Sequence, residues 1–314
     1  MAVTVRLQSQ SFPLRASHDF SWLDSMGEVF TVFDEQDSGN ISFGVRQEDG
    51  RKFFVKYAGA ETMQYQGDIK EAAQRLQQAM TVYADLTHQS LIKLVNHFAT
   101  GAGYAAVFDW IEGENLHPHW SFPPPAKYTN PASPYYQYRQ LPVEQRMASL
   151  DEIYAFHAAV EQKGYVAVDF YDGSIMYDFE SGSTQICDID FYRKGPFTNH
   201  MGRMWGSSRF MSPEEFVKGA TIDGITNVFN MGAAAFVLLG GELDRAFSKW
   251  EASPELYEVA LKAVEPDRQQ RYSSVAEFYE AWRRFFLKYR ITMKQGILTV
   301  ATVVNPSKKS AKEF

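Results

Sequence analysis

Carboxylates end two short apolar runs in the segment from residue 164 to residue 192, GYVAVDFYDGSIMYDFESGSTQICDIDFY. The first run leads into Asp169, and the second leads into Asp188 and then Asp190. An ionised carboxylate is costly to bury without a partner, so carboxylates in these places indicate a metal site, a bound phosphate or a proton-transfer step. Asp also begins ordinary turns, and that simpler interpretation stays open at this point.

The composition is that of a globular protein with two lobes or domains, because 314 residues exceed the roughly 100 to 200 of a usual domain. The net charge of −7 argues against a general nucleic-acid binder. The N-terminus lacks the apolar core of a signal peptide, and no apolar run approaches the roughly 20 residues of a membrane helix. We therefore expect a cytoplasmic protein with neither a nucleic-acid nor a membrane partner. The single cysteine, Cys187, reads as a small buried hydrophobe.

The residues before the acidic segment have the pattern of an antiparallel sheet with one helix. Extended apolar runs, expected as strands, occupy residues 28–33, 41–45, 52–57, 91–98 and 104–110. Asp49 and Gly50 predict a hairpin between the second and third runs, because both tolerate the positive φ of a tight turn. Apolar residues at three- and four-residue steps predict a helix over residues 67–86. A polar leader, residues 1–27, precedes these elements and receives no strand or helix.

Prolines and tyrosines are frequent in residues 111–141, where a connector leads into a loop that we expect to be irregular. Residues 142–290 read as mainly helical, and the proline at their start suits the first turn of a helix. The tail, residues 291–314, is mixed. Residues 296–304 are compatible with a strand, and residues 306–314 are expected to be disordered.

The order of these elements and of several motifs resembles the protein kinase-like superfamily, in the form of a bacterial Ser/Thr protein kinase-like chain with divergent motifs. The resemblance covers roughly residues 28–286. The motifs that carry it are FFVK at 53–56 for VAIK, HQSLIKL at 88–94 for HPNIVKL, VAVDFYDGS at 166–174 for the catalytic loop, DID at 188–190 for DFG, SPE at 212–214 for APE and DRQQR at 267–271 for DPxxR. It implies an α+β, bilobal fold with a β-rich N-lobe at 28–110, a hinge and loop at 111–141 and a mainly α C-lobe at 142–290.

The resemblance also implies specific pairings within the C-lobe. The Arg of the DPxxR motif pairs with the APE glutamate in the family, so Arg271 is expected to pair with Glu214. Arg268 takes the place of the proline in that motif. Asn227 stands where the family has the Asp of a DxWSxG segment.

The activity that the resemblance implies is ATP- and Mg²⁺-dependent phosphoryl transfer, which needs charge neutralisation and positioning more than covalent chemistry. Asp169 and Lys56 are the expected catalytic residues: Asp169 would orient the substrate hydroxyl and accept its proton, and Lys56 would hold nucleotide phosphates. A lysine whose stem packs at a strand end while its ammonium stays in water is the simpler interpretation of Lys56. The expected nucleotide-binding residues are Lys56, Gly39, Ile41, Asp109, Ser174 and Asp188, and the expected metal ligands are Asp188, Ser174 and Asp190.

Several motif positions depart from the family. The glycine-rich loop falls on residues 34–41, where Gly39 is its only glycine, and Asp34 and Asp37 would repel phosphates if they faced them. Ala79 stands at the position of the helix glutamate, which leaves Glu71 as a weak candidate partner for Lys56. Three departures lie in the catalytic loop: Ala167-Val168 for His-Arg, Tyr171 for Lys and Ser174 for Asn.

Three functions stay open. A Ser/Thr protein kinase is favoured, because the SPE motif and Arg271 are uncommon in the related small-molecule kinases. The stretch FDWIEGE at 108–114 also resembles the connector of aminoglycoside and choline phosphotransferases, which keeps a small-molecule alcohol as a possible substrate. A pseudokinase that binds partners without catalysis would explain the missing glycines, Asn and helix glutamate.

Overall fold

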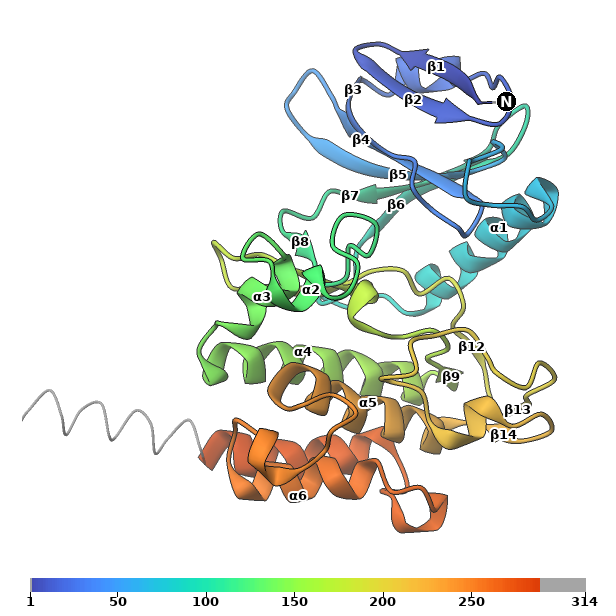
Figure 1. Ribbon diagram of the computed structural model, residues 1–314. Helices are drawn as coiled ribbons and strands as arrows, with labels where there is room; N and C mark the ends of the chain where they lie inside the picture. The colour runs from blue at the N-terminus through green and yellow to red at the C-terminus, as the bar shows by residue number, and fades with distance from the viewer. Residues whose placement is uncertain (1, 289–314) are drawn as a thin grey trace, which may run out of the picture.

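The computed structural model describes residues 2–288, which form an antiparallel β-rich part above a mainly helical part (Figure 1). The upper part holds a five-stranded antiparallel sheet of order β3-β4-β5-β7-β6. Its strands are β3 (Glu28–Phe33), β4 (Asn40–Arg46), β5 (Lys52–Ala58), β6 (Leu94–Ala99) and β7 (Tyr104–Asp109). Their positions confirm the predicted strands within a few residues, and the fold is mixed α and β with antiparallel sheets.

One long helix, α1 (Ile69–Asp85), packs on one face of this sheet. It begins at Asp68, whose carboxylate accepts a hydrogen bond from the backbone N–H of Lys70 at 2.7 Å and so caps the first turn. Its apolar side chains join a core that continues from the sheet down into the helical part. The helix predicted over residues 67–86 is therefore confirmed, with bounds two residues later at the start and one earlier at the end.

The first 27 residues are structured rather than a bare leader. β1 (Val3–Leu7) and β2 (Gln10–Leu14) form an antiparallel hairpin, and a 3₁₀ helix, η1 (Ser21–Ser25), follows. Apolar residues of these elements cover the face of the five-stranded sheet that α1 does not: Leu7, Phe12, Leu14, Phe20 and Leu23. The sequence does not predict these elements, because polar residues interrupt each apolar run and the packing partners lie on the distant sheet.

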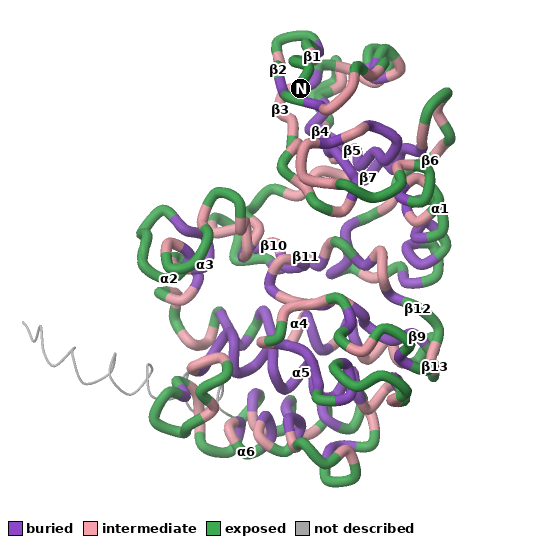
Figure 2. The backbone as a smooth tube through the Cα atoms, turned by 45° about the vertical axis from the view of Figure 1, so that its right-hand side comes forward, coloured by how far each residue is buried: buried purple, intermediate pink, exposed green. Residues whose placement is uncertain are grey.

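The lower part is built on α4 (Val143–Gln162), which buries one side, and α5 (Gly224–Leu239), which is buried almost throughout (Figure 2). The helix α6 (Pro254–Ala263) packs on α5, and a further helix occupies residues 275–288. α5 is apolar all round, as expected for a helix enclosed on every side. Asp223 and Thr226 cap its start reciprocally.

Short elements make up the rest of the described fold. Residues 111–141 were expected to be irregular, but they contain α2 (Ala126–Thr129) and α3 (Pro134–Arg139); Pro134 occupies the first turn of α3, where a missing N–H costs nothing. The remaining strands are β8 (Glu114–Asn115), β9 (Tyr165–Val166), β10 (Ile175–Tyr177), β11 (Thr184–Ile186), β12 (Arg193–Lys194), β13 (Phe197–Thr198) and β14 (Thr221–Ile222). The remaining 3₁₀ helices are η2 (Asp172–Ser174), η3 (Pro213–Phe216), η4 (Phe247–Lys249) and η5 (Arg268–Gln270).

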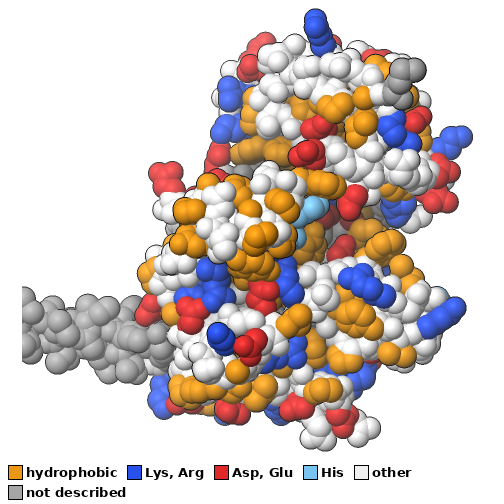
Figure 3. All heavy atoms as spheres, viewed as in Figure 1, with side chains coloured by type: hydrophobic (Ala, Val, Ile, Leu, Met, Phe, Trp, Pro, Cys, Tyr) orange, Lys and Arg blue, Asp and Glu red, His pale blue; other side chains and the backbone are white. Residues whose placement is uncertain are grey.

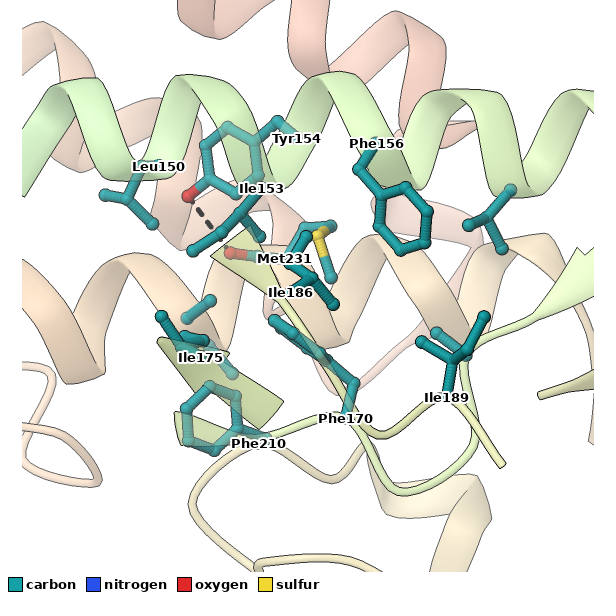
Figure 4. Packing of buried hydrophobic residues seen from close by; sticks show 14 of the residues in the cluster. Leu150, Ile153, Tyr154, Phe156, Phe170, Ile175, Ile186, Ile189, Phe210 and Met231 are labelled. Carbon is teal, nitrogen blue, oxygen red and sulfur yellow. Dashed lines mark hydrogen bonds between the residues drawn. The ribbon is translucent and has the colours of Figure 1, made fainter. Parts of the chain in front are cut away.

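The two apolar runs of the acidic segment lie in different sheets. β9 pairs with β12, whereas β11 pairs with β10, a strand that the sequence did not reveal. Side chains from this segment join the core to which α4 and α5 contribute, where the Tyr154 hydroxyl also donates to the carbonyl oxygen of Met231 at 3.1 Å (Figure 4). The strand at 296–304 and the disordered end at 306–314 lie outside the described residues.

Candidate functional site

A lysine and two aspartates from distant parts of the chain meet between the two parts of the fold. The ammonium of Lys56 lies 2.8 Å from Oδ1 of Asp188 and 2.7 Å from Oδ2 of Asp190. Burial alone would lower the pKa of Lys56, but the two carboxylates raise it well above its ordinary value. Lys56 is therefore a fixed positive charge, and its ammonium does not lie in open water as the simpler interpretation of this lysine required.

The strand register decides which side chains share the face of Lys56. Ser42 is the cross-strand partner of Lys56, and Ile41 is the partner of Tyr57. Because side chains alternate along a strand, Ile41 points to the opposite face, where it is fully buried in the core under the β1–β2 hairpin. The assignment of Ile41 to a nucleotide site on the Lys56 face is therefore wrong.

Asp169 lies close enough to Asp188 and Lys56 for their charges to act on its carboxyl group. Burial raises the pKa of Asp169 to about 7, and the negative charges of Asp188, Asp37 and Glu215 add to the effect. Its φ of 65° is one that Asp tolerates better than most residues. The neighbouring Phe170 is buried in the main core and anchors the loop (Figure 4). A carboxylic acid that titrates near neutrality is a suitable acceptor for a hydroxyl proton.

Asp188 and Asp190 flank a buried anchor. Ile189 is fully buried between them (Figure 4), and its backbone N–H donates to the hydroxyl of Tyr83 at 3.1 Å. The same hydroxyl donates to Oδ1 of Asp190 at 3.0 Å. Both oxygens of Asp190 thus have partners within the protein, whereas the side chain of Asp188 is 49% exposed. Asp188 is the better placed of the two for a ligand.

The helix α1 contributes a tyrosine, and no glutamate, to this cluster. Glu71 is exposed, and the ion pairs of Lys56 within residues 2–288 are those with Asp188 and Asp190. The weak assignment of Glu71 as the partner of Lys56 is therefore wrong. Tyr83 lies one turn after Ala79, on the same face of the helix, and reaches the site through Asp190.

Ser174 lies beside Asp188 through the backbone. The N–H of Cys187 donates to the carbonyl oxygen of Ser174 at 2.9 Å, and the hydroxyl of Ser174 is buried without a hydrogen-bond partner in the described chain. Buried hydroxyls are normally paired, so this oxygen fits a missing ligand. Burial raises the pKa of the Cys187 thiol to about 12, which agrees with an inert, partly buried cysteine.

A largely buried charge cluster surrounds Asp172, three residues after Asp169. It consists of Asp172, Lys127, Arg209, His117 and Glu242. The guanidinium of Arg209 binds Asp172 in a bidentate pair at 2.7 and 2.9 Å, and the fully buried ammonium of Lys127 also contacts that carboxylate. Burial alone would raise the pKa of Asp172, but these cations hold it below its usual range. Through these contacts the cluster joins α2, which carries Lys127, and the segment of Arg209 to the loop that contains Asp169 and Asp172.

No sequence pattern pointed to this cluster. Lys127 stands among prolines and tyrosines, and 45 residues separate it from Asp172. Burial lowers the pKa of His117 to about 4, so its Nδ1 is free to accept a hydrogen bond from Lys127 at 2.7 Å. Asp172 lies between an aromatic residue and a glycine in the sequence, and this position does not indicate its partners.

In the expected glycine loop, Gly39 is covered by the side chain of Tyr65, whereas residues 34–38 are half-buried or exposed. Gly39 has a φ of 84°, and a Cβ placed there would lie 2.8 Å from the ring of Tyr65. Arg75 donates to the backbone oxygen of Ser38 at 3.0 Å and holds the loop down. Asp37, in the same loop, is close enough to Asp169 to raise its pKa. The loop therefore places the negative charge of Asp37 near the site, and its single glycine, Gly39, is covered by Tyr65.

Asp109 remains a separate surface residue in this structure. It ends β7, and its carboxylate pairs with Lys93 at 3.4 Å. No contact joins it to Lys56 or Asp188 among the described interactions. Its assignment to nucleotide binding stays a prediction.

The one pairing predicted for the helical part is present, and two residues that replace motif residues also have partners. Arg271 binds Glu214 in a bidentate pair at 2.8 and 3.0 Å, as expected. Arg268 binds the same carboxylate at 2.7 Å, although it replaces a proline of the motif. Asn227 accepts a hydrogen bond from the N–H of Ala167 at 2.9 Å, so α5 holds the strand that leads into Asp169.

No protein-family model matches this chain, and no curated protein matches it. None of the helices described in residues 2–288 combines the length and apolar character needed to cross a bilayer. In the same residues no three His, Cys, Asp or Glu side chains are grouped as a metal site.

Proposed function

We propose that this chain is an ATP- and Mg²⁺-dependent phosphotransferase with a bilobal, protein kinase-like fold, acting on Ser or Thr hydroxyls of a protein substrate. The observation that carries the proposal is the convergence of Lys56, Asp188 and Asp169 at one place from elements far apart in the sequence. The Arg271 pair with Glu214 adds support, since it was expected from the same resemblance. A cytoplasmic location belongs to the proposal, because ATP is available there.

Each residue has a distinct role in the proposed reaction. Lys56 binds the nucleotide phosphates with its permanent positive charge. Asp169 accepts a hydrogen bond from the substrate hydroxyl, and its carboxylate takes the proton as that oxygen bonds to the γ-phosphorus of ATP and the bond from the γ-phosphorus to the leaving ADP breaks. Asp190 keeps the ammonium of Lys56 in place through a direct contact of 2.7 Å.

The residues beside Lys56 fit a magnesium ion. Asp188 offers a half-exposed carboxylate, and Ser174 offers a buried hydroxyl that lacks a partner in the described chain. Mg²⁺ is usually held by one or two carboxylates plus substrate phosphates and water, so a closed protein cage is not required. When bound, the ion neutralises charge on the transferred phosphate.

The proposal predicts that ATP stabilises the protein only when Mg²⁺ is present. At a hundredfold excess over the dissociation constant, the gain in unfolding free energy is about 2.7 kcal/mol, which a thermal melt detects. Incubation with labelled ATP, Mg²⁺ and a generic protein substrate is expected to transfer phosphate to Ser or Thr. Asp188→Asn should abolish both effects. Transfer that persists unchanged in Asp188→Asn would contradict the metal assignment, and transfer to small alcohols alone would replace the protein substrate.

Asp190→Asn is expected to lower kcat/KM for ATP by roughly tenfold to a hundredfold, because a misplaced Lys56 no longer meets the phosphates. Tyr83→Phe is the matched variant: it removes only the hydroxyl that holds Asp190 and Ile189, and a smaller loss is expected. Steady-state kinetics with varied ATP measures both. Equal activity of Asp190→Asn and the unaltered protein would show that Lys56 is positioned by other means.

A binding module without catalysis is the second candidate. Gly39 is covered by Tyr65, and Asp37 lies where its charge opposes a phosphate near Asp169. Absence of any Mg²⁺-dependent stabilisation by ATP would favour this second function.

A further inference from the structure

The solvent-facing surface next to Asp169 is basic, although the chain as a whole carries a net charge of −7. Residues 191–218 contain two acidic side chains, Glu214 and Glu215, and both are buried. The exposed charged residues of this segment are Arg193, Lys194, Arg203 and Lys218. A local excess of one sign attracts ligands of the opposite sign.

Three of these cations lack a carboxylate partner within residues 2–288: Arg193, Arg203 and Lys218. Arg203 donates to two backbone oxygens, and Arg193 lies 4.0 Å from the ring centre of Phe197. Lys194 differs from them, because it pairs with Asp85 at 3.8 Å. The unpaired charges are therefore available to a ligand from outside the chain.

Large apolar side chains are exposed among these cations. Four of the twelve exposed large hydrophobic residues of the described chain lie here, and Trp205 and Val217 are 54% and 55% exposed. The other two are Met201 and Phe216. An exposed tryptophan beside other apolar residues is typical of a binding surface rather than of a monomer's ordinary exterior.

Hydrogen bonds hold together the two segments that carry most of these residues, around residues 199–205 and 214–218. The side-chain amide of Asn199 donates to the backbone oxygens of Gly202 and Glu214, at 2.6 and 3.4 Å. The N–H of Met204 donates to the oxygen of Glu215 at 2.9 Å. Figure 3 shows hydrophobic and basic side chains side by side on the lower right of the molecule, where β13 and β14 lie in Figure 1.

This surface begins at the proposed proton acceptor. A Cβ placed on Gly206 would lie 3.7 Å from the Cα of Asp169, so Trp205 is one residue away from direct contact with the catalytic loop. A chain bound over Trp205 would therefore pass Asp169. A small alcohol would use none of this surface.

We propose that the surface formed by Arg193, Met201, Arg203, Trp205, Phe216, Val217 and Lys218 docks an acidic segment of a protein substrate. An apolar residue of that segment packs on Trp205 close to the acceptor Ser or Thr, and its Asp and Glu residues contact Arg193, Arg203 and Lys218. The inference rests on the proposed function and names its substrate class. Asp169 and Asp188 are themselves acidic, so the acidic residues of the substrate lie away from its acceptor hydroxyl.

Two labelled peptides test the docking without any reaction. The acidic peptide contains one Ser beside a Leu, with Asp and Glu further along; in the second peptide every Asp and Glu is replaced by Lys. Fluorescence anisotropy without nucleotide is expected to give at least about tenfold tighter binding of the acidic peptide. The double variant Arg193→Glu, Lys218→Glu should weaken binding of the acidic peptide by about tenfold. Trp205→Ala should also weaken binding of this peptide, by an amount that does not change with salt concentration.

Arg284→Glu, a charge reversal of an exposed residue on the helix of residues 275–288, is the matched control and should leave binding unchanged. Equal binding of the two peptides, no binding of either, or equally tight binding of single-stranded DNA would overturn the docking surface. Phosphorylation of both peptides at equal rates would reject the docking and keep the kinase. Selective binding without any phosphate transfer would keep the docking and reject the proposed function.

Discussion

Asp169→Asn is expected to reduce phosphate transfer by roughly a hundredfold to ten-thousandfold, because the acceptor of the hydroxyl proton is lost. The same change is expected to stabilise the fold at neutral and higher pH. Burial raises the pKa of Asp169 from 3.8 to about 7, so the folded protein ionises this carboxyl only at a cost. The unfolded chain meets no such cost, and an amide is never ionised. Loss of activity together with a gain in stability distinguishes a catalytic carboxylate from a structural one.

The sign and the pH range of the stability gain follow from proton binding. Between pH 3.8 and about 7 the folded protein holds a proton on Asp169 that the unfolded chain has released. The free energy of unfolding of the unsubstituted protein therefore falls as the pH rises through this range. The advantage of Asp169→Asn therefore grows over this range and is constant above it, on the order of 4 kcal/mol. Urea unfolding at several pH values measures it. Asparagine also tolerates the φ of 65° at this position, which alanine does not.

Glu180→Gln is the matched control, because Glu180 is an exposed carboxylate on the loop between β10 and β11. It should change neither activity nor the pH dependence of stability. In the unsubstituted protein, kcat/KM should rise as the pH passes through about 7, the pKa of Asp169 in the folded protein without substrate. A profile that is flat across that range would contradict the role of Asp169 as proton acceptor.

Asp172→Ala is expected to destabilise the protein by roughly 3 to 5 kcal/mol. The substitution leaves the fully buried ammonium of Lys127 and the guanidinium of Arg209 facing each other without their shared carboxylate. The two cations then repel each other; Lys127 is fully buried, and Arg209 keeps only its pair with Glu242 at 3.2 Å. A lower midpoint in urea with an unchanged slope is the expected observation.

Two further variants serve as comparisons for the stability loss of Asp172→Ala. Lys127→Met should cost less than Asp172→Ala, because Asp172 keeps its bidentate partner Arg209. Asp49→Ala removes an exposed Asp–Arg pair and should stay within about 0.5 kcal/mol, as surface ion pairs do. A cost for Asp172→Ala no larger than that for Asp49→Ala would show that the buried charge cluster does not support the fold.

The sequence predicted the residues that follow regular patterns or motif spacing. Five strands, α1 and the pair of Arg271 with Glu214 were foreseen. Ile41 was misassigned because motif counting ignores the alternation of side chains along β4. Lys127 and Asp172 could not be paired from sequence, since the contact depends on α2 folding back onto the loop of Asp169. The substitution of Asp190 and Tyr83 for a helix glutamate likewise depends on where α1 sits on the sheet.

The β1–β2 hairpin changes how the start of the chain should be regarded. Its Phe12 and Leu14 cover Phe43 and Val45 on the outer face of the five-stranded sheet. A chain that began at residue 28 would keep every residue of the candidate site but would expose that apolar face to solvent. Such a chain would be prone to aggregate through the sheet, and poor recovery on expression would then say nothing about its chemistry.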